Sequence, residues 1–238
     1  MGLGVAAGLG LLAGGAAYAS RWPTSQIFGR TLTSARRPGE LALTFDDGPN
    51  PVWTPRLLDV LASHQAHATF FMLGRYAAVQ PELVRRVAAA GHLIGCHAWS
   101  HQSLACAPAR QIREELEQSR QTLEQITGDK IGYFRPPFGA RRPAVLRISR
   151  QLGLEPVLWS AMTNDWAEPE TSEIVARLSA KVERLERRGR AAVIVLHDGS
   201  DTNMEANRAP SVSAADELLQ RFQPTHRFVR VDAWASEA

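Results

Sequence analysis

Cysteine is scarce in this chain of 238 residues, which contains only Cys96 and Cys106. These two form no Cys-x-x-Cys pair and stand at no zinc-ribbon spacing, so a zinc site built from thiolates is excluded. They could pair in an exported protein or stay free. The excess of one charge is also small, because 27 basic side chains face 24 acidic ones and leave a net charge of +3. These charges are too few and too scattered to attract nucleic acid, and we expect no such partner.

Long apolar runs and biased segments are also absent from most of the chain. With 45% hydrophobic and 21% charged residues, the composition is that of an ordinary globular protein. It excludes collagen-like, disordered and multi-span membrane classes. The chain shows no internal repeat and no linker, and its length suffices for a single catalytic domain with a substantial core.

The N-terminus is the exception, since residues 2–20 carry no charged side chain and are about long enough to cross a bilayer as a helix. A small-x-small sequence, 17–19, resembles a signal-peptidase site, although no basic residues precede the apolar stretch. We therefore expect a signal peptide or single membrane anchor over 1–20, a connecting segment over 21–39 and the catalytic domain over 40–238. This predicts an extracytoplasmic protein, secreted or anchored at the cell envelope. A buried Ala/Gly-rich helix in a cytoplasmic protein is the alternative.

From residue 40 onward, short apolar runs alternate with longer amphipathic stretches, which predicts an α/β fold. The expected strands are 41–45, 68–72, 92–95, 132–134, 156–159, 192–196 and 227–231. The expected helices are 55–63, 81–90, 108–126, 143–152, 171–188 and 213–222. Roughly seven strands separated by helices imply a parallel sheet covered by helices, either closed as a barrel or open and doubly wound.

Unusual polar residues follow several of these strands. In parallel α/β folds, active sites lie at the carboxyl ends of the strands. Asp46 and Asp47 come after the first strand, and His97 and His101 come after the third. The spacing of four predicts that both imidazoles lie on one face of a helical turn and suits a divalent metal. An Asp-rich turn and a coincidental His pair are the structural alternatives. Together the residues predict a site of two histidines and one carboxylate, with coordination left open for water.

Further candidate residues follow the later strands. Arg135 can hold a carboxylate by a bidentate pair, and the two prolines after it stiffen the loop that leads to Phe138 and Gly139. The segment 164–166 carries Asp165, and His197 follows the strand 192–196. A histidine beside a carboxylate stays oriented and basic enough for proton transfer. A proline-rich loop and a structural histidine are the alternatives.

These five segments, 44–49, 97–101, 135–139, 165–166 and 196–198, resemble in their order the five motifs of the polysaccharide deacetylase family, related to the nodulation chitooligosaccharide deacetylases. The resemblance spans about residues 40–231. It implies a distorted (β/α) barrel and a metal-dependent hydrolase that removes N-acetyl groups from a polysaccharide such as peptidoglycan or a chitin-like glycan. This sequence departs from the commonest pattern of the family at three positions. Cys96 stands where Asn is common, Ala98 where the family often has Ser or Thr, and Phe138 where Tyr is frequent.

The resemblance also implies residue roles. The metal ligands would be Asp47, His97 and His101, and the ion zinc, with Co²⁺, Ni²⁺ or Mn²⁺ as alternatives. The catalytic group would comprise Asp46 as general base, His197 as general acid, Arg135 holding Asp46 and Asp165 orienting His197. The substrate would meet Phe138, whose backbone N–H stabilises the oxyanion, and an acetyl pocket lined by Trp166 and Leu196.

Three other functions stay open at this stage. An acetyl-ester hydrolase acting on a polysaccharide such as xylan would use the same metal and base. A non-catalytic carbohydrate-binding relative would lack a ligand, base or acid, and a structural metal domain would need a fourth protein ligand. The expected partner is an N-acetylated glycan, and the sequence leaves the oligomeric state undefined.

Overall fold

The computed structural model describes residues 18–20, 22–167 and 170–237. Most of the expected signal peptide or anchor, residues 1–17, lies outside the described residues. Among the helices that the structure describes, none is both long enough and apolar enough to span a bilayer.

Strands and helices alternate along the chain as the sequence predicts. The strands are β1 Glu40–Asp46, β2 Thr69–Met72, β3 Leu93–Cys96, β4 Tyr133–Phe134, β5 Glu155–Pro156, β6 Ala161–Met162, β7 Ala192–His197 and β8 Arg227–Phe228. The helices are α2 Trp53–Ser63, α3 Gly74–Val79, α4 Pro81–Ala89, α5 Ala109–Thr127, α6 Pro143–Gln151, α7 Thr171–Glu186 and α8 Ala209–Phe222, with 3₁₀ turns η1 Pro137–Gly139, η2 Asp165–Ala167 and η3 Val231–Glu237.

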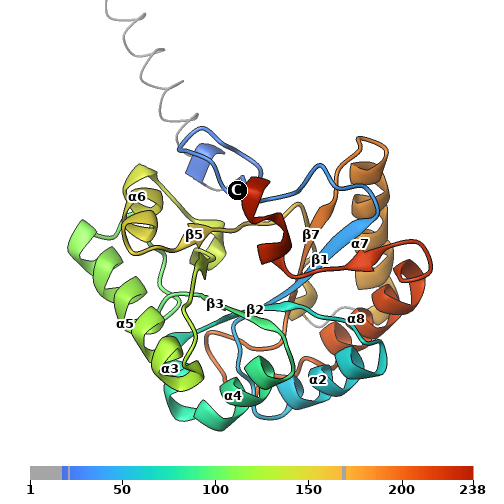
Figure 1. The fold of residues 1–238 in the computed structure, drawn as a ribbon, viewed down its shortest axis with the longest axis horizontal. Coiled ribbons are helices and arrows are strands. Elements are labelled where there is room, and N and C mark those ends of the chain that lie inside the picture. Colours follow the sequence, from blue (N-terminus) through green and yellow to red (C-terminus); the bar gives the residue numbers. More distant parts are fainter. Residues whose placement is uncertain (1–17, 21, 168–169, 238) are drawn as a thin grey trace, which may run out of the picture.

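All strand pairs are parallel, and the sheet runs in the order β5-β4-β3-β2-β1-β7-β6, with β8 beside β1. The helices lie outside the strands and surround them (Figure 1). This is the distorted barrel with about seven parallel strands that the sequence and its resemblance imply. Because the strands are parallel, their carboxyl ends meet at one rim, with the central β1 beside β7 and β2.

Two apolar layers result from the alternation of side chains along the strands. In β1, Leu41, Leu43 and Phe45 join the larger core between sheet and helices, together with α2 and α8 residues such as Leu57 and Leu218. Ala42 instead joins a smaller core inside the curled sheet, where Phe71, Trp159 and Trp234 also lie. The same alternation gives Thr44 and Asp46 the inner side of β1, where both contact Arg135.

The structure adds elements that the sequence pattern did not show. Helix α3 has only 6 residues and β6 has 2, both shorter than periodicity can detect. Helix α8 begins four residues earlier than expected, with Pro210 in its first turn, where a missing N–H costs nothing. Strands β5 and β8 are shorter than predicted, because each pairs with its neighbour at only two positions.

One local prediction is wrong: His97 and His101 do not lie on a helical turn. The segment between β3 and α5 begins as a loop in which Ala98 and His101 have positive φ angles of 65° and 66°. The backbone therefore reverses locally, and the two imidazoles meet through the loop and not through helical spacing.

Candidate active site

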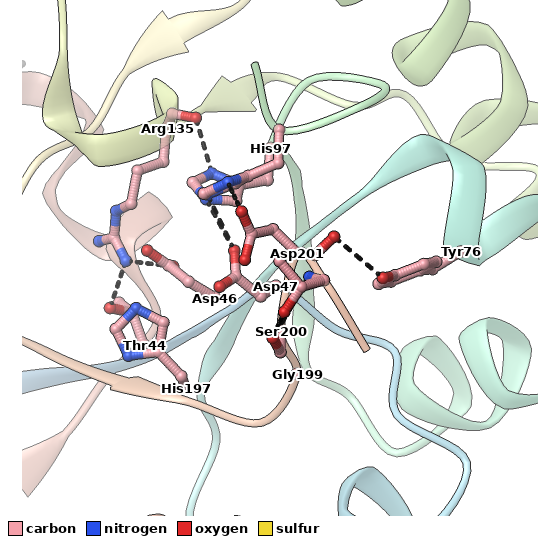
Figure 2. A network of polar contacts seen from close by, with 12 residues as sticks. Thr44, Asp46, Asp47, Tyr76, His97, Arg135, His197, Gly199, Ser200 and Asp201 are labelled. Atoms are coloured by element: carbon pink, nitrogen blue, oxygen red, sulfur yellow. Dashed lines mark hydrogen bonds and ion pairs between the residues drawn. The ribbon is translucent and has the colours of Figure 1, made fainter. Parts of the chain in front are cut away.

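The polar residues singled out in the sequence gather around one cavity at the carboxyl rim of the sheet (Figure 2). Its volume is about 470 Å³, within the range of small-molecule sites. Its lining comprises Asp46, Asp47, His97, His101, Phe138, Trp159, Met162, Trp166, His197, Ser200, Asp201, Thr202 and Arg208. The end of β1 supplies Asp46, and Asp47 follows it directly. The loop after β3 supplies two imidazoles, and the end of β7 supplies the third.

Asp47, His97 and His101 form a buried cluster whose ligand atoms all lie within 4.8 Å of one another. The Oδ1 atom of Asp47 is 3.3 Å from Nε2 of His97 and 3.1 Å from Nε2 of His101. This buried oxygen has no hydrogen-bond partner among the described residues, as expected of an atom reserved for a cation. Two imidazole nitrogens and one carboxylate oxygen fit a divalent transition metal with open coordination positions.

The opposite ring nitrogens of these histidines are also held. The backbone carbonyl of Arg135 lies 2.8 Å from Nδ1 of His97, and a carboxylate oxygen of Asp201 lies 3.2 Å from Nδ1 of His101. The first contact is a hydrogen bond, which fixes the tautomer of His97 and leaves its Nε2 available for a metal. The second is an ion-pair contact without hydrogen-bond geometry, so Nδ1 of His101 has no hydrogen-bond partner among the described residues. Asp201, which Figure 2 shows beside the cluster, was missed in the sequence because it lies in a loop that no strand pattern marks.

The electrostatics of Asp47 suit a metal ligand. Burial alone would raise the pKa of its carboxyl group, but the neighbouring imidazoles of His97, His101 and His197 hold this pKa far below its ordinary value. The carboxylate is therefore ionised across the physiological range. Burial lowers the pKa of His101, with the charge of His97 acting in the same direction, so the neutral ligand form is favoured.

Asp46 forms a fully buried ion pair with Arg135. The guanidinium NH1 donates to Oδ1 of Asp46 at 2.6 Å and to the Thr44 hydroxyl at 2.8 Å. The arginine is further fixed by the carbonyl of Leu158 at 3.2 Å and lies over the Phe71 ring at 4.1 Å. These contacts fix the position of the Asp46 carboxylate at the cavity wall.

His197 pairs with Asp165 and not with the neighbouring Asp198. Nδ1 of His197 is 2.9 Å from Oδ1 of Asp165, whose other oxygen accepts the backbone N–H of His197 at 2.8 Å. Burial alone would lower the pKa of His197, but Asp165, supported by Asp47 and Asp46, raises it to about 9. A protonated imidazole thus faces the cavity, opposite the Asp47 cluster.

Asp198 has a different place, buried beneath the site against the hydroxyl of Thr54. Burial raises its pKa to about 7. Its side chain points away from the cavity lining, as alternation along the chain after His197 requires.

Of the three residues expected to contact the substrate, two line the cavity and one does not. Phe138 is 60% exposed, and its ring contacts His101 edge-on at 4.5 Å between centroids. Trp166 contacts His197 in the same manner at 4.9 Å. Leu196, however, is fully buried in the core between sheet and helices and is not part of the cavity lining. Neighbouring strand residues face opposite sides, so Leu196 cannot share the inner side with His197, and Trp159 and Met162 supply the apolar wall instead.

Backbone strain is concentrated at this site. Of the five non-glycine residues with positive φ in the described chain, Asp47, Ala98, His101 and Phe138 belong to the site or its loops. Each such conformation costs of order 1–3 kcal/mol and persists only where the surrounding structure imposes it. These strained backbone conformations lower the stability of the fold and orient the side chains of the site.

Gly199 gives a test of this packing. A Cβ atom at this position would lie 2.0 Å from the carbonyl oxygen of Asp47, which is backbone and cannot give way. We expect Gly199→Ala to destabilise the protein by about 1–3 kcal/mol or more and to weaken metal binding by displacing Asp47. Thermal unfolding and zinc titration would measure both. Gly132→Ala is the control, since nothing lies within 4 Å of its Cβ, and equal behaviour of the two variants would contradict the explanation.

Comparison with known proteins agrees with this geometry. A family model described as polysaccharide deacetylase matches residues 33–157. A chitooligosaccharide deacetylase of a Bradyrhizobium species is 42% identical over 188 residues, covering 76% of this chain and 83% of the relative. A peptidoglycan-N-acetylglucosamine deacetylase of Bacillus cereus is 31% identical over 194 residues, covering 80% and 85%.

A solved structure shows the same fold. A peptidoglycan N-acetylglucosamine deacetylase in complex with 4-naphthalen-1-yl-N-oxidanyl-benzamide superposes with a TM-score of 0.76 at 29% identity, covering 85% of this chain and 91% of that one. The motif order, the rim geometry and these relatives lead to one conclusion: the chain belongs to the polysaccharide deacetylase family and is a hydrolase that acts on the carbon–nitrogen bond of N-acetyl groups.

Proposed function

We propose that this enzyme is a metal-dependent N-acetyl hydrolase acting on the N-acetylglucosamine units of a glycan, either a chitin-like oligomer or peptidoglycan. The buried cluster of Asp47, His97 and His101, with its unpartnered Asp47 oxygen, carries the proposal. The relatives named above act on chitooligosaccharide and on peptidoglycan N-acetylglucosamine, which supports this substrate class.

These three residues would hold zinc or a similar divalent ion. When bound, such an ion supplies Lewis acidity toward the acetyl carbonyl and lowers the pKa of water toward neutrality. Asp46, fixed by Arg135, would accept a proton from the attacking water as its oxygen bonds to the amide carbon. The backbone N–H of Phe138 would donate to the oxyanion that develops.

His197 would complete the reaction from the opposite side of the cavity. As the carbon–nitrogen bond breaks, its Nε2 proton passes to the departing sugar nitrogen, so acetate and a free amine are the products. Asp165 stabilises the protonated imidazole through its bond to Nδ1. Trp166, Trp159 and Met162 would bound the space for the acetyl methyl and exclude longer acyl groups.

Acetate release is the direct test. The purified, zinc-loaded protein would be assayed in parallel on chitooligosaccharides, peptidoglycan and acetylated xylan, with and without a chelator. We expect chelator-sensitive release from an N-acetylated glycan. Release from xylan alone would instead identify an acetyl-ester hydrolase, and zinc binding without release from any substrate would favour a carbohydrate-binding role.

The pH profile gives a second test, because His197 must be protonated to act as the acid. The activity of the enzyme is therefore lost as pH rises through the pKa of His197. Asp165→Asn removes the carboxylate that raises this pKa, so the alkaline limb of kcat/KM should move to lower pH by about one unit or more. The acid limb should stay in place. An alkaline limb that does not move would show that another group donates the proton.

We also propose that the enzyme works outside the cytoplasm, at the cell envelope. The uncharged stretch 2–20 and a peptidoglycan-acting relative support this location. Cell fractionation would test it, since recovery in the cytoplasmic fraction alone would contradict export.

A further inference from the structure

A second hollow adjoins the catalytic cavity across the ring of Phe138. Its volume is about 710 Å³, and the two hollows share Phe138, Trp159 and Met162 as a common wall. Its lining also includes Ser20, the last residue of the expected signal peptide or anchor, and Trp22 and Pro23 of the connecting segment. We call this second hollow the Trp22 groove.

The side chain of Arg141 fixes this segment to the rim. Arg141 is buried, and its NH2 group donates to the carbonyls of Trp22 and Ser25, both at 2.8 Å. Its NH1 group donates to the carbonyl of Gly139 at 3.1 Å, in the 3₁₀ turn that carries Phe138. The backbone N–H of Arg141 also donates to the carbonyl of Ser20 at 3.2 Å. One arginine therefore joins the connecting segment to the turn at the mouth of the active site.

The attached segment exposes the large aromatic ring of Trp22 to solvent. Trp22 is 55% exposed and stacks on Tyr18 with 5.7 Å between ring centroids and an interplanar angle of 17°. Phe138, which faces the same groove, is also exposed. Exposed aromatic rings at the edge of a concave surface are typical of a binding site, because they offer apolar contact area at small entropic cost.

We propose that the Trp22 groove is a subsite for a sugar unit next to the one being deacetylated, with Trp22 as the platform on which that sugar stacks. The inference rests on the proposed function, because it assumes a glycan in the catalytic cavity. Continuity of the two hollows through Phe138 supports it, since a chain that leaves the cavity on this side must enter the groove. The hydroxyl-bearing residues Ser20 and Ser103 in the lining suit a polyhydroxylated ligand.

The other occupant to be tested is a membrane surface. Aromatic residues at the end of an apolar segment commonly lie at the membrane interface, and Tyr18 and Trp22 flank the end of the stretch 2–20. A concave groove continuous with the cavity favours the sugar.

The test compares substrates of increasing length in the full chain. Trp22→Ala should leave kcat/KM unchanged for the shortest acetylated oligomer that the enzyme accepts as a substrate. For long chitooligosaccharides it should lower kcat/KM by about 3- to 10-fold, the range given by one lost aromatic contact. Trp22→Phe should restore most of the difference. Ile27→Ala is the matched control, because Ile27 is 67% exposed in the same segment but does not line the groove. Since Trp22 is exposed, folding should be unaffected.

Binding separates failure of the subsite from failure of the proposed function. Calorimetric titration of the Asp46→Asn protein and the Asp46→Asn, Trp22→Ala protein with a long chitooligosaccharide should show weaker binding only when Trp22 is replaced. Absence of acetate release by the unaltered enzyme would reject the function, whereas this titration would still decide the subsite. The subsite would be overturned if Trp22→Ala lowered kcat/KM equally for oligomers of all lengths, or did not lower it at all. A Trp22→Ala protein that lost only its binding to lipid vesicles would overturn it as well.

Discussion

Asp46→Asn should lower kcat by about 10²- to 10⁴-fold, the usual contribution of a positioned general base. Asparagine matches aspartate in shape but cannot accept the proton of the attacking water. Zinc content should stay the same as in the unaltered protein, since Asp46 is not part of the metal cluster. Steady-state acetate release and metal analysis of the same sample would measure both effects.

Stability must be measured in this variant as well. Arg135 is fully buried, and Asp46 is its ion-pair partner at 2.6 Å. Removing one partner of a buried pair typically costs about 3–5 kcal/mol, so thermal unfolding should occur at lower temperature. Assays well below the new unfolding temperature keep the two effects separate. A folded, zinc-bound Asp46→Asn protein with normal kcat would show that another group is the base.

His101→Ala should abolish metal binding and acetate release together. It removes one of the three candidate ligands found among the described residues, and loss of a residue that contacts a ligand without touching the metal already costs about 10- to 100-fold in affinity. Asp201→Asn provides that intermediate case, because its carboxylate contacts His101 at Nδ1 and not the metal position. We therefore expect zinc affinity to fall in the order unaltered protein, Asp201→Asn, His101→Ala.

A histidine remote from the site serves as the control. His64 follows α2 and pairs with Asp216 at 2.6 Å, away from the cavity lining. His64→Gln should keep zinc affinity and turnover, with at most a modest loss of stability. Isothermal titration of the metal-free proteins with zinc would rank the variants. Full activity of His101→Ala in the presence of a chelator would reject metal dependence.

The alternation of strand and helix patterns was sufficient to predict the parallel α/β fold, and the motif order indicated the family. It also placed five polar segments at one rim, because parallel strands bring their carboxyl ends together. Within β1, alternation explains why Asp46 faces inward beside Thr44. The same rule applied to β7 would have shown that Leu196 faces away from His197, so this error came from the family pattern and not from a missing signal.

The two cysteines illustrate the opposite case. Both are free, with Cys96 buried at the end of β3 and Cys106 exposed beyond the histidine loop. Burial raises the pKa of Cys96 to about 11, so its thiol stays protonated in the core between sheet and helices. The sequence had left their pairing open, and the structure shows both as free thiols.

The sequence by itself determined the order of strands and helices and the rim on which the candidate metal ligands meet, because these depend on local periodicity and chain direction. The tertiary structure decided the rest: the left-handed backbone that brings His101 to Asp47, the pairing of His197 with Asp165, the contact of Asp201 with His101 and the attachment of Trp22 by Arg141. Each of these joins segments whose separation is set by packing, and local sequence carries no signal for where loops from different strands will meet.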